Sequence, residues 1–108
     1  MGNSIVKKIN GKDRGFKFSL LMLELFSEKS GISLPGIAEH LEGKPFKSII
    51  ILLWAANKVY NKGKEVTDYE IDDWMSTMSQ EDFQDIWNCF EDSTVDLLGK
   101  IEGGTKKK

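Results

Sequence analysis

Hydrophobic and polar residues alternate near the start of the chain, on both sides of an Asn-Gly pair. The apolar positions of this alternation are Ile5, Ile9, Phe16 and Phe18. Asn10-Gly11 tolerates positive φ at both residues, as the two-residue turn of a β-hairpin requires. The pattern predicts a hairpin over 5–18, in which Gly15 marks a bulge or a close backbone approach. A lone hairpin is marginal in water, so it must pack on helices or pair with another chain's edge.

Three helical segments are expected after the hairpin. Ser19 can cap a helix that runs to about Ser30, before Gly31. A short helix is predicted over 33–43, with a proline in its first turn. The third helix, over 45–61, has the centre IIILLWAA, which is apolar on all sides. Because this segment has no internal breaker, it is predicted to be the central helix.

Two amphipathic helices complete the pattern. Thr67 and Glu70 form a capping box, and Ser79 followed by Asp82 repeats the signal more weakly. Apolar residues recur at helical spacing behind each cap. In the first helix they are Ile71, Trp74, Met75 and Met78; in the second they are Phe83, Ile86, Trp87, Phe90, Leu97 and Leu98. Gly99 is predicted to end the last helix.

The expected fold is therefore mainly α, with an N-terminal β-hairpin followed by about five helices packed around a central apolar helix. The length of 108 residues fits one domain, predicted over 1–102, with a disordered basic tail at 103–108. A single cysteine excludes an internal disulfide and favours a reducing, cytoplasmic setting. The longest apolar run, 49–56, is too short to cross a membrane.

Charge divides the chain into two parts of opposite sign. Residues 65–99 include eleven acids and no lysine or arginine, whereas residues 1–64 carry eleven cations and five acids. Such asymmetry suggests interaction, either within the fold or between copies. We hypothesise that ion pairing between neighbouring copies drives self-association. The acidic part would repel the phosphates of nucleic acids and suits basic or amphipathic protein partners.

Residues with reactive chemistry form no recognisable site. His40 and Cys89 are each the only residue of their kind, and their spacing matches no Cys–His catalytic motif. The acids over 68–73 resemble the start of a calcium loop, but Asp73 stands at its glycine position and Ser79 at its bidentate glutamate. No glycine-rich phosphate loop is present. We expect a protein that is no enzyme and has no metal or cofactor.

The order of these motifs resembles the tail assembly chaperones of long-tailed bacteriophages and related prophages. The hairpin sequences INGK (9–12) and FKF (16–18) look like the opening of that family. The turn SGIS (30–33) follows a leucine-rich first helix, as it does there. The segments ILLWAANK (51–58) and VTDYEIDD (66–73) are similar to the family's next two helices.

The resemblance implies a non-enzymatic assembly factor. Such chaperones bind the long helical tape measure protein in the host bacterial cytoplasm, keep it soluble while the tail tube assembles, and are absent from the mature virion. Many also have a longer product made by ribosomal frameshifting, through which they contact the tail tube protein. The physical role would be to cover the apolar stripe of a helical client, with acidic charge keeping the complex soluble.

Aromatic residues left over after folding would make that contact. The predicted partner-binding residues are Trp54, Tyr60, Tyr69, Trp74, Met78, Trp87 and Phe90. One alternative is a small acidic inhibitor that mimics DNA, with carboxylates along one exposed face and the aromatic rings buried. Another is direct nucleic-acid binding, which needs the five hairpin cations on one face. Those cations are Lys7, Lys8, Lys12, Arg14 and Lys17.

Overall fold

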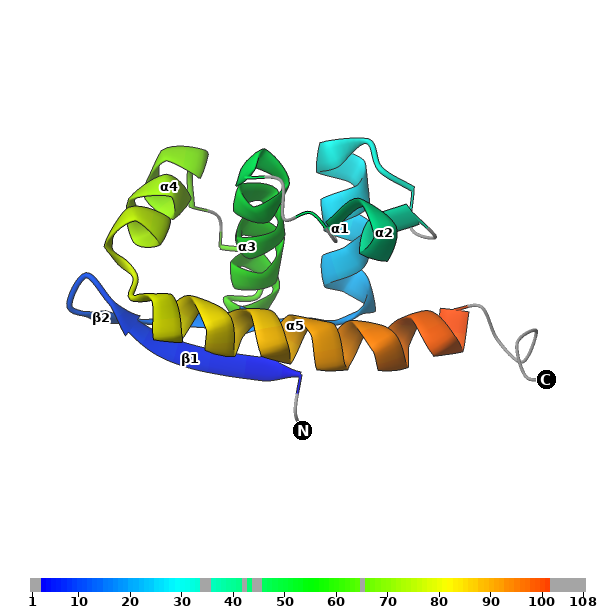
Figure 1. The fold of residues 1–108 in the computed structure, drawn as a ribbon. Helices are drawn as coiled ribbons and strands as arrows, with labels where there is room; N and C mark the ends of the chain where they lie inside the picture. Colours follow the sequence, from blue (N-terminus) through cyan, green and yellow to red (C-terminus); the bar gives the residue numbers. More distant parts are fainter. Residues whose placement is uncertain (1–2, 34–35, 42, 44–45, 65, 102–108) are drawn as a thin grey trace.

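The chain folds into a hairpin followed by five helices (Figure 1). The computed structural model describes residues 3–33, 36–41, 43, 46–64 and 66–101. Its elements are β1 (Ser4–Ile9), β2 (Lys12–Lys17), α1 (Leu20–Ser30), α2 (Ile37–Leu41), α3 (Phe46–Tyr60), α4 (Asp68–Thr77) and α5 (Gln80–Ile101). The predicted fold class is confirmed. The tail expected at 103–108 lies outside the described residues.

The hairpin has the predicted turn and a regular register. Asn10 and Gly11 both have positive φ, at 55° and 78°. β1 pairs antiparallel with β2, from the pair of Ile9 with Lys12 next to the turn to the pair of Ser4 with Lys17. Gly15 lies opposite Val6 without a bulge. The expectation of a close backbone approach at Gly15 is confirmed, because the ring of Tyr60 lies against it.

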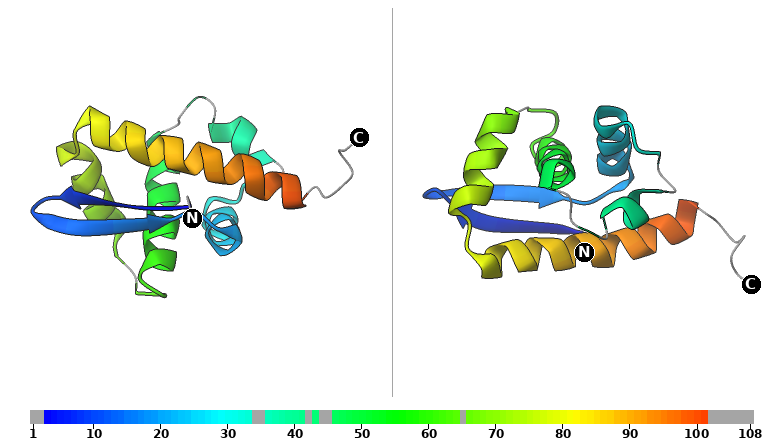
Figure 2. Two further views of the ribbon diagram at one scale, coloured as in Figure 1. Left: turned by 90° about the horizontal axis from the view of Figure 1, so that it is seen from below. Right: turned by 45° about the horizontal axis from the view of Figure 1, so that its top comes forward.

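The elements form two layers. The hairpin and α5 make up the lower layer of Figure 1, and α1, α3 and α4 stand side by side upon it. Figure 2 shows that α3 runs across the strands of the hairpin. In the same figure α5 lies along the side of β1 that faces away from β2. Thus segments from the two ends of the sequence lie together, because Lys7 of β1 contacts Asp82 and Asp85 of α5.

The core is centred on α3, which packs against α1, α4 and β2. Leu52, Leu53 and Ala56 of this helix are buried, as its all-round apolar sequence predicts. Aromatic contacts join the hairpin to the last two helices. Phe16 meets Trp74 of α4 edge to face at 6.1 Å, and Phe18 meets Phe90 of α5 at 5.7 Å.

Most helix boundaries follow the predicted caps. Ser19 accepts a hydrogen bond from the Met22 N–H, and Gly31 ends α1 in the left-handed region at φ 82°. Both hydrogen bonds of the Thr67–Glu70 capping box are present, each at 3.1 Å. The first turns of these helices are thus set by local sequence.

The end of α5 differs from the prediction. We expected Gly99 to end this helix, but it continues to Ile101. Glycine ends a helix when it leaves the right-handed region, as Gly31 does, and it can otherwise remain helical at a modest cost. Within the described ranges, no helix has both the length and the apolar composition needed to cross a membrane.

Candidate partner-binding surface

Four of the seven predicted contact residues belong to the core. Trp54, Trp74, Trp87 and Phe90 are all buried. Arg14 lies 4.7 Å from the Trp74 ring, and Lys29 lies 4.6 Å from the Trp54 ring. The rings are therefore enclosed by their own chain, because an amphipathic helix buries its apolar stripe before a partner arrives. Direct contact with a partner must come from other side chains.

The other three predicted residues are more accessible. Tyr69 at the start of α4 is 85% exposed, and Tyr60 at the end of α3 is 40% exposed. Met78 is half-buried and packs against the core. Exposed apolar residues that the sequence analysis did not single out are Val6, Leu20, Leu21, Phe46 and Val95. Leu20 and Phe46 begin helices, and Val95 stands between Thr94 and Asp96, so periodicity alone cannot assign these three to core or surface.

On α4, the exposed aromatic ring stands among carboxylates. Tyr69 is followed at i+3 and i+4 by Asp72 and Asp73, so the three side chains share one helix face. Both aspartates are exposed, and neither carboxylate forms an ion pair within the described part of the chain. The opposite face of α4 carries the buried Ile71 and Trp74. We call Tyr69, Asp72 and Asp73 the α4 patch.

The outer face of α5 repeats this arrangement. Val95 is 76% exposed and is preceded at i−4 and i−3 by Glu91 and Asp92, with Asp96 beside it. All three acids are exposed, and among the described residues no lysine or arginine forms an ion pair with them. We call Glu91, Asp92, Val95 and Asp96 the α5 patch. Each patch thus combines one exposed apolar side chain with uncompensated negative charge.

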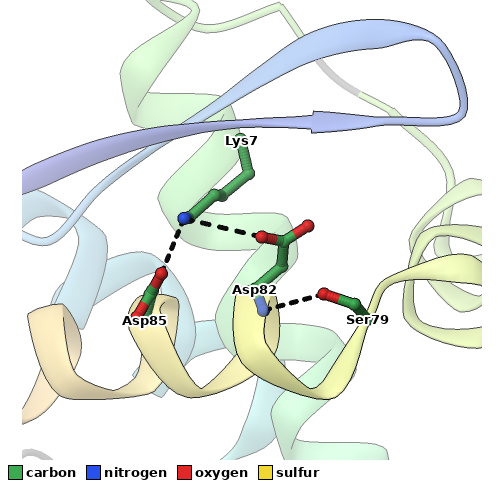
Figure 3. A network of polar contacts seen from close by, with 4 residues as sticks. All are labelled: Lys7, Ser79, Asp82 and Asp85. Carbon is green, nitrogen blue, oxygen red and sulfur yellow. Dashed lines mark hydrogen bonds and ion pairs between the residues drawn. The ribbon is translucent and has the colours of Figure 1, made fainter.

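The first turns of α5 face the hairpin instead (Figure 3). Lys7 of β1 lies with its Nζ 2.7 Å from Asp85 Oδ2 and 3.5 Å from Asp82 Oδ1. Ser79 accepts a hydrogen bond from the Asp82 N–H at 3.0 Å, which caps the helix. The hydrogen bond to Asp85 raises the pKa of Lys7, and partial burial opposes this less strongly.

Opposite charges of the two sequence parts therefore meet within one chain. The third ion pair of the described residues also joins them, from Lys29 Nζ to Asp68 Oδ1 at 3.8 Å. These pairs use part of the acidic charge at 68–85 and leave the α5 patch uncompensated. Ion pairing between copies stays a hypothesis.

The cations of the hairpin do not share one face. Lys7 and Arg14 lie opposite each other and turn toward α5 and Trp74. Lys8 and Lys17 point to the other face, since side chains alternate along a strand. The arrangement that nucleic-acid binding through this hairpin would need is therefore absent from the described strands.

Sequence reasoning missed one pair of polar residues with reactive chemistry. His40 Nε2 lies 2.7 Å from Ser48 Oγ, within hydrogen-bond distance. Ser48 is only 8% exposed, so a substrate has little access to its hydroxyl, and the bond connects α2 to the first turn of α3. In the described part of the chain, no three acidic, histidine or cysteine side chains converge as a metal site would require.

A scan against protein-family models finds no match for this chain, and searches of curated proteins and of solved structures find none either. The family suggested by the sequence motifs therefore stays a prediction.

Proposed function

We propose that this protein is a non-enzymatic assembly chaperone that holds a basic, amphipathic helix of a partner on the α4 and α5 patches. The observation that carries the proposal is that an exposed apolar residue, Tyr69 or Val95, twice stands beside carboxylates that form no ion pair among the described residues. An amphipathic helix offers an apolar stripe beside basic residues, which complements both features. The sequence resemblance identifies the expected client as the tape measure protein of a phage tail.

Weak, repeated contacts suit this role. A tail chaperone must release its client when tube subunits assemble around it, so one very tight site would be a disadvantage. Two small patches would each contribute modest affinity, and several copies bound along one long client would add to the total. The negative charge would also speed the encounter with a basic client. Binding would weaken at high salt, because salt screens this attraction.

The alternative is a DNA-mimic inhibitor that occupies a basic nucleic-acid-binding surface. One observation favours it: the carboxylates of the α5 patch are exposed while the tryptophans are buried. The two functions differ in what they require of Tyr69 and Val95. A DNA mimic needs only the carboxylates, whereas a helix holder needs the apolar side chains as well.

The test measures binding of a fluorescent synthetic peptide helix with a leucine stripe and flanking lysines. We expect Tyr69→Ala and Val95→Ser each to weaken binding about three- to tenfold, because each removes an apolar contact. Neutralising Asp92 and Asp96 to asparagine should weaken binding and reduce its salt dependence. The DNA-mimic function replaces the chaperone if two results are found together. Only the neutralised variant loses binding, and duplex DNA competes with this protein for the surface of a basic DNA-binding protein. Wild-type protein that does not bind the peptide at low salt would contradict the proposal.

A further inference from the structure

One side of the hairpin faces away from the helices. Phe16 points into the core, so the neighbouring pair of Val6 with Gly15 faces away from it, because side chains alternate along a strand. In the left panel of Figure 2, which shows the molecule from below, the strands lie in front of α3 and α4. We use the name outer hairpin face for the five residues whose exposed side chains project from this side. They are Ser4, Val6, Lys8, Asp13 and Lys17.

The centre of the outer hairpin face is apolar. Val6 is 45% exposed, and its cross-strand partner Gly15 has no side chain to cover it. The ring of Tyr60, at the end of α3, lies against Gly15 instead and is itself 40% exposed. Opposite positions of a strand pair lie close together, so the valine and the tyrosine form one small apolar centre.

Two lysines flank this apolar centre. Lys8 follows Val6 by two residues along β1, which places it about 7 Å away at the usual rise of a strand. Lys17 lies diagonally across from Val6 on β2, about 7–8 Å away on the other side. Neither lysine forms an ion pair with another described residue. Because two lysines stand against the one carboxylate of Asp13, the outer hairpin face is positively charged.

The α5 patch has a similar arrangement with the opposite charge. Its apolar residue, Val95, is 76% exposed, and Glu91 and Asp92 precede it by about one helical turn. Asp96 follows it directly, so acids flank the valine as lysines flank Val6. In the ranges that the structure describes, no ion pair joins the two surfaces within one chain. A second copy can therefore supply the opposite charge that each surface lacks.

We propose that the outer hairpin face of one copy docks on the α5 patch of a second copy. In this contact Val6 and Tyr60 pack against Val95, while the two flanking lysines lie beside the three acids. The α4 patch is a weaker match for the hairpin. It has two acids rather than three, and Lys29 already pairs with Asp68 in the first turn of its helix.

The contact should be weak and sensitive to salt. Exposed ion pairs each contribute little, so the association requires a high protein concentration. Salt screens such pairs, so the association should decline as the salt concentration rises. Where the proposed function holds, a second copy and a client helix exclude each other on the α5 patch. Self-association is measured without a client, so its outcome is independent of the chaperone function.

Charge reversal on the outer hairpin face tests the contact against a control with the same change in net charge. The hairpin variant carries Lys8→Gln and Lys17→Glu, and the control carries Lys12→Gln and Lys47→Glu. Lys12 projects from the other side of the hairpin, and Lys47 lies in the first turn of α3, at the far end from Tyr60. At about 0.01 M salt, where screening extends over about 30 Å, concentrated wild type and control should at least double their light-scattering mass. The hairpin variant should stay monomeric.

A second variant should restore the contact in a mixture. Asp92→Lys and Asp96→Lys reverse the charge of the α5 patch, so this patch variant should also be monomeric alone. An equal mixture of the hairpin and patch variants should associate, because each reversed surface meets its complement on the other variant.

All the substituted side chains are exposed, so the melting curves of both variants, followed by circular dichroism, should match that of the wild type. Three results would each overturn the proposal. They are a wild type that is monomeric at every concentration, a hairpin variant that associates as the wild type does, and a mixture of the two variants that stays monomeric.

Discussion

The ring of Tyr60 occupies the space that a side chain at position 15 would fill, so α3 docks on β2 only because that residue is glycine. The same contact region includes the hydrogen bond from Asn57 to the Gly15 carbonyl. One turn of α3 therefore holds the hairpin both by shape and by a buried polar contact. Since Phe16 and Phe18 follow directly, this docking also sets the position of two core rings.

Gly15→Ala should destabilise the fold. A Cβ at this position would overlap the Tyr60 ring, so the ring must swing outward and lose its contact. We expect the free energy of unfolding, measured in urea, to fall by about 1–3 kcal/mol, as for other overpacked sites.

A double-mutant cycle identifies the cause of that loss. Tyr60→Ala removes the ring that the new methyl group meets, so adding Gly15→Ala to it should cost less than it does in the wild type. Additive losses would show that the glycine matters for another reason, such as strand conformation.

Asn57→Ala tests the polar part of the docking. This side chain is buried, and its loss would leave the Gly15 carbonyl without its hydrogen bond. We expect a loss of about 1–3 kcal/mol in the free energy of unfolding. Asn61→Ala is the matched control, because its exposed amide donates to Asn57 Oδ1 at 3.1 Å and should change stability by less than about 0.5 kcal/mol.

The contact of Lys7 with α5 should stabilise the fold up to alkaline pH. Its folded-state pKa is raised above 10.5, chiefly by the hydrogen bond to Asp85. A cation with a raised pKa stabilises fully below its unfolded-state value and loses that effect as pH rises through the folded-state value. We therefore expect the melting temperature of the wild type to exceed that of Lys7→Met at neutral pH, with the difference closing above pH 10.5.

Lys8→Met controls for the general effect of removing a lysine from β1, since Lys8 forms no ion pair with any other described residue. Its melting temperature should follow that of the wild type across the pH range. A difference for Lys7→Met that persists in strong alkali would contradict the role assigned to the ion pair.

Local sequence determines most of the fold, and particular elements show why. The Asn10-Gly11 turn, the Ser19 cap and the Thr67–Glu70 box all act over four residues or fewer, and each appears as predicted. The end of α5 was predicted wrongly, because glycine permits a helix end but does not force one. The pairing of Lys7 with Asp85 joins residues 78 positions apart, and nothing in the local pattern specifies it.

The surface was harder to predict than the fold. Trp54, Trp74 and Trp87 were expected at a partner contact on the basis of the number of large rings, but all three are buried. Tyr69 was identified, whereas Val95 was not, because a lone valine among acids carries little signal in the sequence. Exposure depends on which helix face meets the core, and that requires the packed structure.

The thiol of Cys89 should react slowly for a cysteine. Burial raises its pKa above the ordinary value of 9.0. The hydrogen bond with Ser93 opposes this less strongly, and the negative charge of Asp92 adds a smaller upward effect. Since the thiolate is the reactive form, we expect iodoacetamide labelling of the folded protein to have a higher pH midpoint than labelling in urea. Coinciding midpoints would show that the folded protein does not shelter this thiol.

The last prediction separates stability from binding. Trp87 is buried between Phe83 and Phe90, at centroid distances of 6.1 and 5.2 Å, so Trp87→Ala should lower the free energy of unfolding by about 3–5 kcal/mol. Tyr69→Ala should leave it within about 0.5 kcal/mol of the wild type, because the ring is exposed. Binding of the peptide helix should show the reverse order when measured at a temperature at which both variants are folded. If folded Trp87→Ala loses binding and Tyr69→Ala retains it, the partner contacts the core-facing side of α5, and the α4 and α5 patches are not the binding surface.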